Sequence, residues 1–144
     1  MEWRDRAVVE ALTWLGTPYV PRARVKGVGC DCGGILYEIY NPYFGPFAPF
    51  PTDYPVDWAC HSEEQRYLNF IMPYVHEVEM SGKGGFALFH LQKAYAHAAI
   101  NLGDGRFLHA WGRTGAGQVT ITPYRVLKAL SKTHPPKHFE PIEK

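Results

Sequence analysis

A short stretch rich in glycine and cysteine, directly ahead of an apolar run, constrains this chain most. Residues 29–34 are Gly-Cys-Asp-Cys-Gly-Gly, and residues 35–40 are Ile-Leu-Tyr-Glu-Ile-Tyr. A loop that leads into a helix in this way places Cys32 in the first turn, where unpaired N–H groups and the helix dipole favour an anion. We therefore expect a lowered thiol pKa and a nucleophilic Cys32, and we expect the glycines to let another segment approach closely.

Composition narrows the class of protein. The chain has 144 residues, 46% apolar and 20% charged, which predicts one globular domain over residues 1–144. A net charge of +1 without a basic cluster argues against a nucleic-acid partner. The three cysteines are an odd number, and neither a signal peptide nor a run of about 18 apolar residues is present. We expect no disulfide framework, no membrane span and synthesis in a reducing cytoplasm.

Helical periodicity is clearest in the first part of the chain. It predicts an amphipathic helix from Arg4 to Leu15, ended by Gly16, and a cysteine helix that stops near Asn41-Pro42 because proline cannot continue it. Residues 42–81 form an insertion that begins with a packed loop rich in proline and aromatic residues. A capping box at residues 62–65 predicts a helix from Glu63 to about Met72 in the same insertion.

The period changes in the second part of the chain. Short apolar runs predict four strands, over residues 86–89, 96–102, 107–111 and 119–122. A last helix is expected over residues 124–131, and residues 132–144, with three prolines, are predicted to be an extended C-terminal arm.

The turn between the second and third of these strands decides where two histidines point. In a two-residue Asp104-Gly105 turn, position 102 pairs with 107, and His97 and His109 lie on opposite faces. In a three-residue turn with Gly105 left-handed, 102 pairs with 106 and the two histidines are diagonal neighbours on one face, roughly 7–8 Å apart at the backbone. That spacing allows a hydrogen bond between the rings, so we predict the longer turn.

Cys32, His97 and His109 then form a nucleophile, a base and a group that orients the base. A thiol needs a base within hydrogen-bonding distance, and a third polar group fixes the tautomer of that base. His90, at the end of the first predicted strand, is the reserve candidate for the base. A metal site built from Cys30, Cys32 and the Cys60-His61 pair is disfavoured because the spacing lacks the usual two intervening residues. Cys60 is expected to be a small buried hydrophobic residue.

The order of these motifs resembles the NlpC family of papain-like cell-wall endopeptidases. The resemblance covers most of the chain and rests on Gly16-Thr17-Pro18-Tyr19, Asp31-Cys32-x-Gly34, His97-Ala98-Ala99-Ile100 and Gly103 to Ala110. The Val25 to Cys30 lead-in and the Tyr54-Pro55 to Trp58 segment resemble the branch found in phage tail and gene-transfer-agent clusters.

The resemblance implies a papain-like α+β fold in which the nucleophile helix packs on an antiparallel sheet. It also implies a cysteine peptidase that cleaves peptidoglycan peptides between D-glutamate and the diamino acid, through a thioester and without a metal or other cofactor. Cys32, His97 and His109 match the catalytic positions, and Tyr19, Asp31 and Gly33 match positions for substrate or oxyanion binding. Gly33 stands where many relatives have serine, and Gly84-Gly85 stands where Gly-Asp is frequent.

The same resemblance suggests where the chain works. We expect synthesis in a bacterial cytoplasm, delivery on a phage tail tip, and action on the stem peptide in the periplasm or cell wall, with other tail-tip proteins as partners. Two alternatives stay open: a structural tail component that works by docking, and an intracellular amidase or acyltransferase, because fold alone does not fix chemistry.

Overall fold

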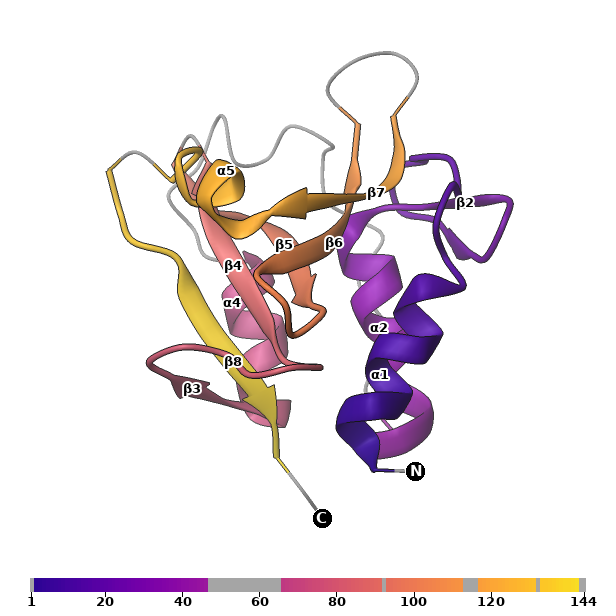
Figure 1. The fold of residues 1–144 in the computed structure, drawn as a ribbon, viewed down its shortest axis with the longest axis horizontal. Coiled ribbons are helices and arrows are strands. Elements are labelled where there is room, and N and C mark those ends of the chain that lie inside the picture. The colour runs from indigo at the N-terminus through magenta and orange to yellow at the C-terminus, as the bar shows by residue number, and fades with distance from the viewer. Residues whose placement is uncertain (1, 47–65, 92, 113–116, 132, 143–144) are drawn as a thin grey trace.

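An antiparallel sheet is the centre of the computed structural model, which describes residues 2–46, 66–91, 93–112, 117–131 and 133–142. Its six strands lie in the order β3-β8-β4-β5-β6-β7 (Figure 1). Their bounds are β3 Val75–Val78, β4 Phe86–Leu91, β5 Ala94–Asn101, β6 Arg106–Trp111, β7 Gln118–Pro123 and β8 Lys137–Pro141. The predicted α+β class with an antiparallel sheet is confirmed.

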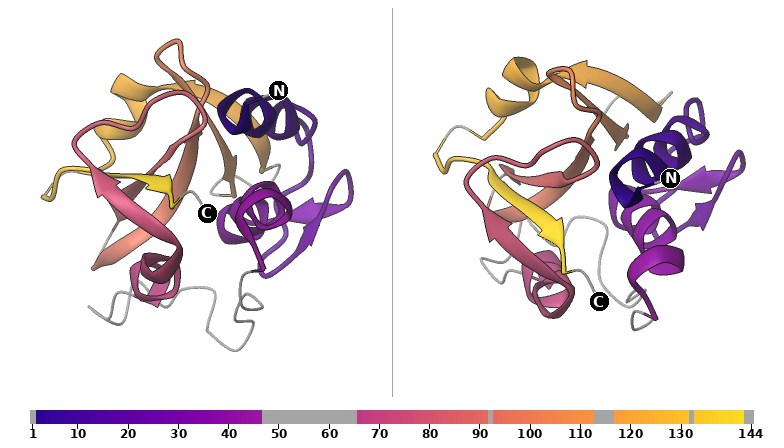
Figure 2. Two further views of the ribbon diagram at one scale, coloured as in Figure 1. Left: turned by 90° about the horizontal axis from the view of Figure 1, so that it is seen from below. Right: turned by 60° about the horizontal axis from the view of Figure 1, so that its bottom comes forward.

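Helices cover both faces of this sheet. The helices α1 (Trp3–Leu12) and α2 (Cys32–Phe44) lie side by side against one face, and the short α5 (Tyr124–Lys128) lies on the other (Figures 1 and 2). Alternation along β4 supplies both layers, because Leu88 packs toward α1 and α2 while Ala87 and Phe89 pack toward α5. A strand buried on both faces explains why residues 86–89 are an unbroken apolar run.

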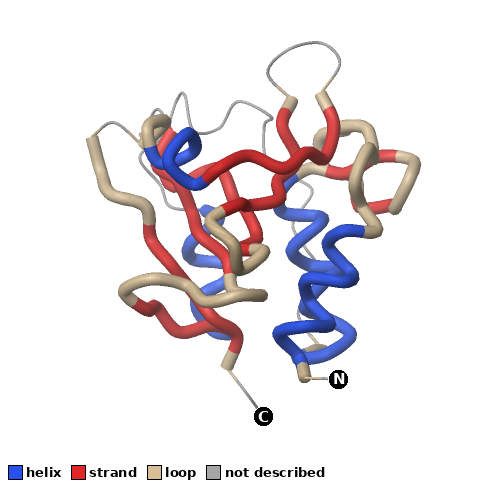
Figure 3. Tube along the Cα trace, in the orientation of Figure 1, coloured by secondary structure: helices blue, strands red, loops and turns tan. Residues whose placement is uncertain are grey.

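Smaller elements complete the chain. A two-stranded sheet of β1 (Arg24–Val25) and β2 (Gly29–Cys30) leads directly into α2 (Figure 3). The helix α4 (Arg66–Ile71) and the single turn η1 (Met72–Tyr74) lead into β3. No helix among the described residues is long and apolar enough to cross a membrane.

The helix ends differ from the predicted ones. The first helix ends at Leu12, and Gly16, with φ +81°, lies in the turns that follow. The cysteine helix does not stop at Asn41-Pro42: it includes Pro42 and ends at Phe44. Pro42 lies in the last turn, where the lost N–H removes only one hydrogen bond, and the Gly45 N–H donates to the Asn41 carbonyl at 2.7 Å. The predicted last helix, 124–131, is also shorter and ends at Lys128.

The predicted C-terminal arm is a strand inside the sheet. Residues 137–141 are extended, as expected, but β8 pairs with β3 on one side and β4 on the other. Phe139 of β8 is fully buried and stacks on Phe86 with ring centroids 5.6 Å apart. The prolines around this segment are unusual in a strand within a sheet, so the sequence does not indicate the pairing of β8. Its partner β3 was not predicted either. The irregular loop predicted over residues 42–60 is wrong at its start, because residues 42–44 belong to α2. Residues 47–60, the capping box and Cys60 lie outside the described residues.

Candidate active site

The β5–β6 hairpin has the longer of the two turns considered. Ile100 pairs with Leu108, and the Leu102 N–H donates to the Arg106 carbonyl at 3.0 Å. Gly105 has φ +82°, in the left-handed region that favours glycine. The predicted three-residue turn and its register are therefore confirmed.

This register brings the two histidine rings together. Nε2 of His97 and Nδ1 of His109 lie 2.9 Å apart, and the rings are nearly perpendicular. Both side chains are buried, and Trp111 lies against both rings, with centroids 5.1 Å from His97 and 5.7 Å from His109. Burial lowers the pKa of His97 to about 3, with a contribution from His109, and lowers the pKa of His109 to about 4. Both imidazoles are therefore neutral at pH 7.

A threonine continues the hydrogen-bonded chain beyond His109. The Oγ1 atom of Thr122, on β7, lies 2.8 Å from Nε2 of His109. Neither Thr122 nor the covering Trp111 was predicted from the sequence. The loop between β6 and β7 carries no turn motif that fixes its length, so the sequence does not determine the pairing of β7.

Cys32 begins α2 beside the strand that carries His97. Its Sγ lies 3.7 Å from the carbonyl oxygen of Ala96, and the backbone N–H of Ala98 lies close enough to lower the thiol pKa. These two residues flank His97 in the sequence of β5, so the thiol lies alongside the strand that carries His97.

The expected lowering of the thiol pKa is wrong for this structure. Burial raises the pKa of Cys32 to about 12, and the charge of the adjacent Asp31 adds to the rise. Asp31 is also the N-cap of α2, since its Oδ1 accepts the Gly34 N–H at 2.8 Å. The carboxylate thus takes a helix N–H group that was expected to stabilise the thiolate, and both the thiol of Cys32 and the imidazole of His97 are neutral at pH 7.

Asp31 also joins the start of the helix to the segment that precedes β1. Its Oδ2 accepts the N–H of Arg22 at 2.7 Å, and the residue is only 7% exposed. An ionised carboxylate has no proton to donate to an oxyanion. Asp31 therefore positions α2, and its expected part in substrate or oxyanion binding stays a prediction.

Tyr19 lies near the thiol. Burial raises its pKa to about 12, with further contributions from the charges of Cys32 and Asp31. A Cβ atom added at Gly112 would overlap the Tyr19 ring, so this glycine makes room for the tyrosine. Gly33, the second residue of α2, lines an apolar hollow with Tyr37, Phe70 and other residues.

The close approach expected at the glycines is present. A Cβ atom at Gly34 would overlap the carbonyl oxygen of Ala23, in the loop that precedes α2. The Asp31 N–H donates to that same carbonyl at 3.1 Å. The loop is thereby held directly against the first turn of the helix.

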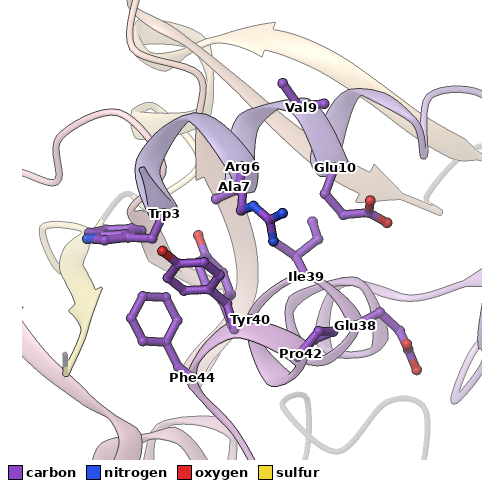
Figure 4. Close-up of a pocket in the computed structure, with 11 residues that line it drawn as sticks. Trp3, Arg6, Ala7, Val9, Glu10, Glu38, Ile39, Tyr40, Pro42 and Phe44 are labelled. Atoms are coloured by element: carbon purple, nitrogen blue, oxygen red, sulfur yellow. The ribbon is translucent and has the colours of Figure 1, made fainter. Parts of the chain in front are cut away.

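The other candidate residues do not join this cluster. His90 stacks on His134 with ring centroids 3.9 Å apart. Cys30 is fully buried, and Cys60 and His61 lie outside the described residues. Within the described ranges, no three His, Cys, Asp or Glu side chains are grouped to hold a metal ion. A separate hollow between α1 and α2, lined by residues that include Trp3, Arg6 and Tyr40, contains none of the candidate residues (Figure 4).

Comparison with solved structures identifies the fold as that of NlpC/p60 domains. The NlpC/p60 domain of the peptidoglycan hydrolase SagA matches with a TM-score of 0.60 and 20% identity, over 95% of this chain and 97% of that chain. NlpC2 from Trichomonas vaginalis matches with a TM-score of 0.65 and 19% identity, over 96% of this chain and 46% of that one. The P60 domain of the M. avium subspecies paratuberculosis antigen MAP1204 has a TM-score of 0.54 and 19% identity, over 84% of this chain and 85% of that one.

At these identities the likeness establishes the fold. No family model and no curated protein sequence matches the chain. The predicted NlpC-type fold is confirmed, and the chemistry of the site depends on the residues described above.

Proposed function

We propose that this chain is a cysteine peptidase that cleaves the peptides of peptidoglycan. The observation that carries the proposal is the hydrogen bond between His97 and His109 on strands beside the Cys32 thiol. A nucleophile, a base and a group that orients the base are the parts that acyl transfer through a thiol requires. The fold supports the substrate class, since one structure with this fold is a domain of a peptidoglycan hydrolase.

The proposed reaction starts from the neutral pair. The Cys32 thiol gives its proton to Nδ1 of His97 as the sulfur attacks the scissile carbonyl carbon, and the C=O electrons move to the oxygen. The backbone N–H of Cys32 and the hydroxyl of Tyr19 are the proposed donors to this oxyanion. The C–N bond then breaks, His97 returns the proton to the leaving amine, and water hydrolyses the thioester.

We further propose that the cut lies between D-glutamate and the diamino acid, and that the chain works on a phage tail tip. The resemblance to the NlpC family supports the position of the cut, and the Val25 to Cys30 lead-in and the Tyr54-Pro55 to Trp58 segment support the tail-tip location. A tail-tip enzyme would open the wall locally, in contact with other tail proteins. Detection of the chain in purified virions by mass spectrometry tests the location separately from the chemistry.

Hydrolysis of purified peptidoglycan tests the activity. Walls that contain diaminopimelate and walls that contain lysine are digested with the wild type and with Cys32→Ser, and the released peptides are identified by mass spectrometry. We expect one defined cut, lost by a factor of at least about 10³ in Cys32→Ser, since a hydroxyl is a far weaker nucleophile than a thiol here.

The matched control is Cys30→Ala. Cys30 lies two residues away, is fully buried and has no part in the proposed reaction, so this variant keeps the cut. A folded wild type that releases no peptide from either wall contradicts the proposal. Equal loss in both cysteine variants would also contradict the assignment of Cys32 as the nucleophile.

A further inference from the structure

Thr122 extends the hydrogen-bonded pair of His97 and His109 and has no role in the proposed reaction described above. Thr122 Oγ1 lies 2.8 Å from Nε2 of His109, while Nδ1 of His109 lies 2.9 Å from Nε2 of His97. In the β6–β7 ladder His109 pairs with Thr120, so Thr122 reaches the ring from the diagonal position on the same face. Both nitrogens of His109 are therefore engaged.

Two neutral imidazoles joined by one hydrogen bond can arrange their protons in two ways. In the first, His97 carries its proton on Nε2 and donates to His109, so Nδ1 of His97 is a free lone pair and His109 donates from Nε2 to Thr122. In the second, His109 donates from Nδ1 and accepts the Thr122 hydroxyl proton, and His97 carries its proton on Nδ1. Only the first arrangement leaves His97 able to take a proton from Cys32.

The Thr122 hydroxyl stabilises the two proton arrangements to different extents. Without it, the first arrangement leaves a largely buried N–H without an acceptor, whereas the second leaves only a lone pair without a donor. Orphaned buried N–H groups are rarer in native proteins than under-satisfied acceptors, which indicates the larger cost. Loss of the Thr122 oxygen therefore disfavours the arrangement that catalysis needs.

We propose that Thr122 is a positioning residue that accepts the Nε2–H of His109 and thereby keeps Nδ1 of His97 unprotonated. This inference rests on the proposed function, because only the peptidase reaction gives that nitrogen a task. Thr122 acts through His109 and does not itself touch the reacting atoms.

Three variants test the role of the hydroxyl. Thr122→Val keeps the branched shape, which suits a strand, and removes only the acceptor. Thr122→Ser keeps the acceptor. Thr120→Val is the matched control, since it lies on the same strand and face directly opposite His109, where no hydrogen bond from it to either ring is observed. We expect kcat for peptide release to fall roughly ten- to hundredfold in Thr122→Val, and to be kept in Thr122→Ser and Thr120→Val.

A spectroscopic measurement makes the test independent of turnover. Long-range proton–nitrogen correlation spectra of protein labelled with nitrogen-15 histidine show which ring nitrogen is protonated. The assignments come from single histidine variants. We expect Nε2–H on both His97 and His109 in the wild type and in Thr122→Ser, and a shift toward Nδ1–H on both rings in folded Thr122→Val.

The outcomes separate the two proposals. A wild type with Nδ1–H on His97 overturns the positioning role, as does a folded Thr122→Val that keeps its tautomers and its rate. Equal loss of rate in Thr122→Val and Thr122→Ser also overturns it, because the serine keeps the acceptor. The expected tautomers in a protein that cuts no wall peptide would support the hydrogen-bond assignment and contradict the peptidase.

Discussion

Two requirements at the start of α2 oppose each other at Cys32. The helix needs an N-cap, and an aspartate is among the best residues for it. The same carboxylate carries a negative charge beside the thiol and raises its pKa, in addition to the larger effect of burial. The start of the helix is thus stabilised by a group that disfavours the thiolate.

We expect Asp31→Asn to lower the pKa of Cys32. The amide has no charge and keeps one oxygen that can accept the Gly34 N–H, while the second acceptor, which binds the Arg22 N–H, is lost. The measurement is the rate of Cys32 alkylation by iodoacetamide against pH, followed by peptide mass spectrometry. The midpoint should move to lower pH.

The control for this experiment is Asp104→Asn. Asp104 is an exposed carboxylate in the β5–β6 turn, paired with Arg106, and its loss should leave the alkylation profile unchanged. An unchanged or higher midpoint in Asp31→Asn would show that the charge of Asp31 does not act on the thiol.

Single residues were predictable where local chain geometry decides them. The turn glycines and the parity of the strand positions are enough to place His97 and His109 on one face. The sign of the Cys32 pKa shift was not predictable, because it depends on how deeply neighbours bury the thiol. Thr122 was missed for a related reason: its contact with His109 depends on the register of β7 against β6, which no motif in the sequence specifies.

The contact between Ala23, which precedes β1, and the first turn of α2 brings a stabilising and a destabilising effect together at Gly34. Replacing a glycine inside a helix by alanine stabilises it by about 1 kcal/mol from propensity alone. At Gly34 the new Cβ would overlap the backbone carbonyl of Ala23, which the Asp31 N–H also binds. A backbone group cannot rotate away as a side chain can, so the steric term outweighs the propensity.

We therefore expect Gly34→Ala to destabilise the protein by about 1–3 kcal/mol, the cost typical of overpacking. Thermal unfolding followed by circular dichroism measures the change. Gly105→Ala is the comparison variant. An alanine at this position is strained by the φ of +82°, but nothing lies within 4 Å of its added Cβ. It should lose only about 1–2 kcal/mol. A higher melting temperature for Gly34→Ala would show that the loop moves aside without cost.

Helices and strands were predictable where a short stretch of sequence specifies them. The strands β4 to β7 follow from apolar runs and turn residues, and each lies within a few residues of its predicted range. The pairing of β8 with β3 joins segments about 60 residues apart, and neither has an apolar run. The reach of α2 past Pro42 depends on the terminal turn tolerating one lost hydrogen bond.

The molecule as a whole carries several buried neutral histidines. His97 and His109 lie in the candidate site. His138 of β8 is also buried, with Ser81 Oγ at 2.9 Å from one nitrogen and the Tyr124 hydroxyl at 2.8 Å from the other. Burial lowers the pKa of all three rings below the ordinary value of 6.5. These histidines therefore bind protons more readily in the unfolded chain than in the folded protein.

We expect the free energy of unfolding to fall as the pH decreases from about 6.5 toward 4. In this window the unfolded histidines take up more protons than the same residues in the folded state, so acid favours the unfolded state. The carboxylate Glu140, whose pKa is lowered chiefly by its hydrogen bond with Arg4, loses its contribution only at pH values below about 4.5. Melting temperatures between pH 7 and pH 5 therefore isolate the histidines.

Two variants sharpen this measurement. His109→Asn removes one buried titrating ring, so its melting temperature should fall less than that of the wild type over the same interval. Thr120→Val changes a residue on β7 that does not titrate and should follow the wild type. The same decrease in His109→Asn as in the wild type would contradict this explanation of the pH dependence.

The position of β8 also bears on when the scaffold of the proposed site is completed. The ribosome has made Cys32 and both histidines well before it makes residues 137–141, yet that last strand lies between β3 and β4 in the middle of the sheet. A nascent or prematurely terminated chain therefore holds every proposed reacting group on an incomplete scaffold. The order of synthesis thus delays completion of the sheet that carries the proposed site until residues 137–141 have been made.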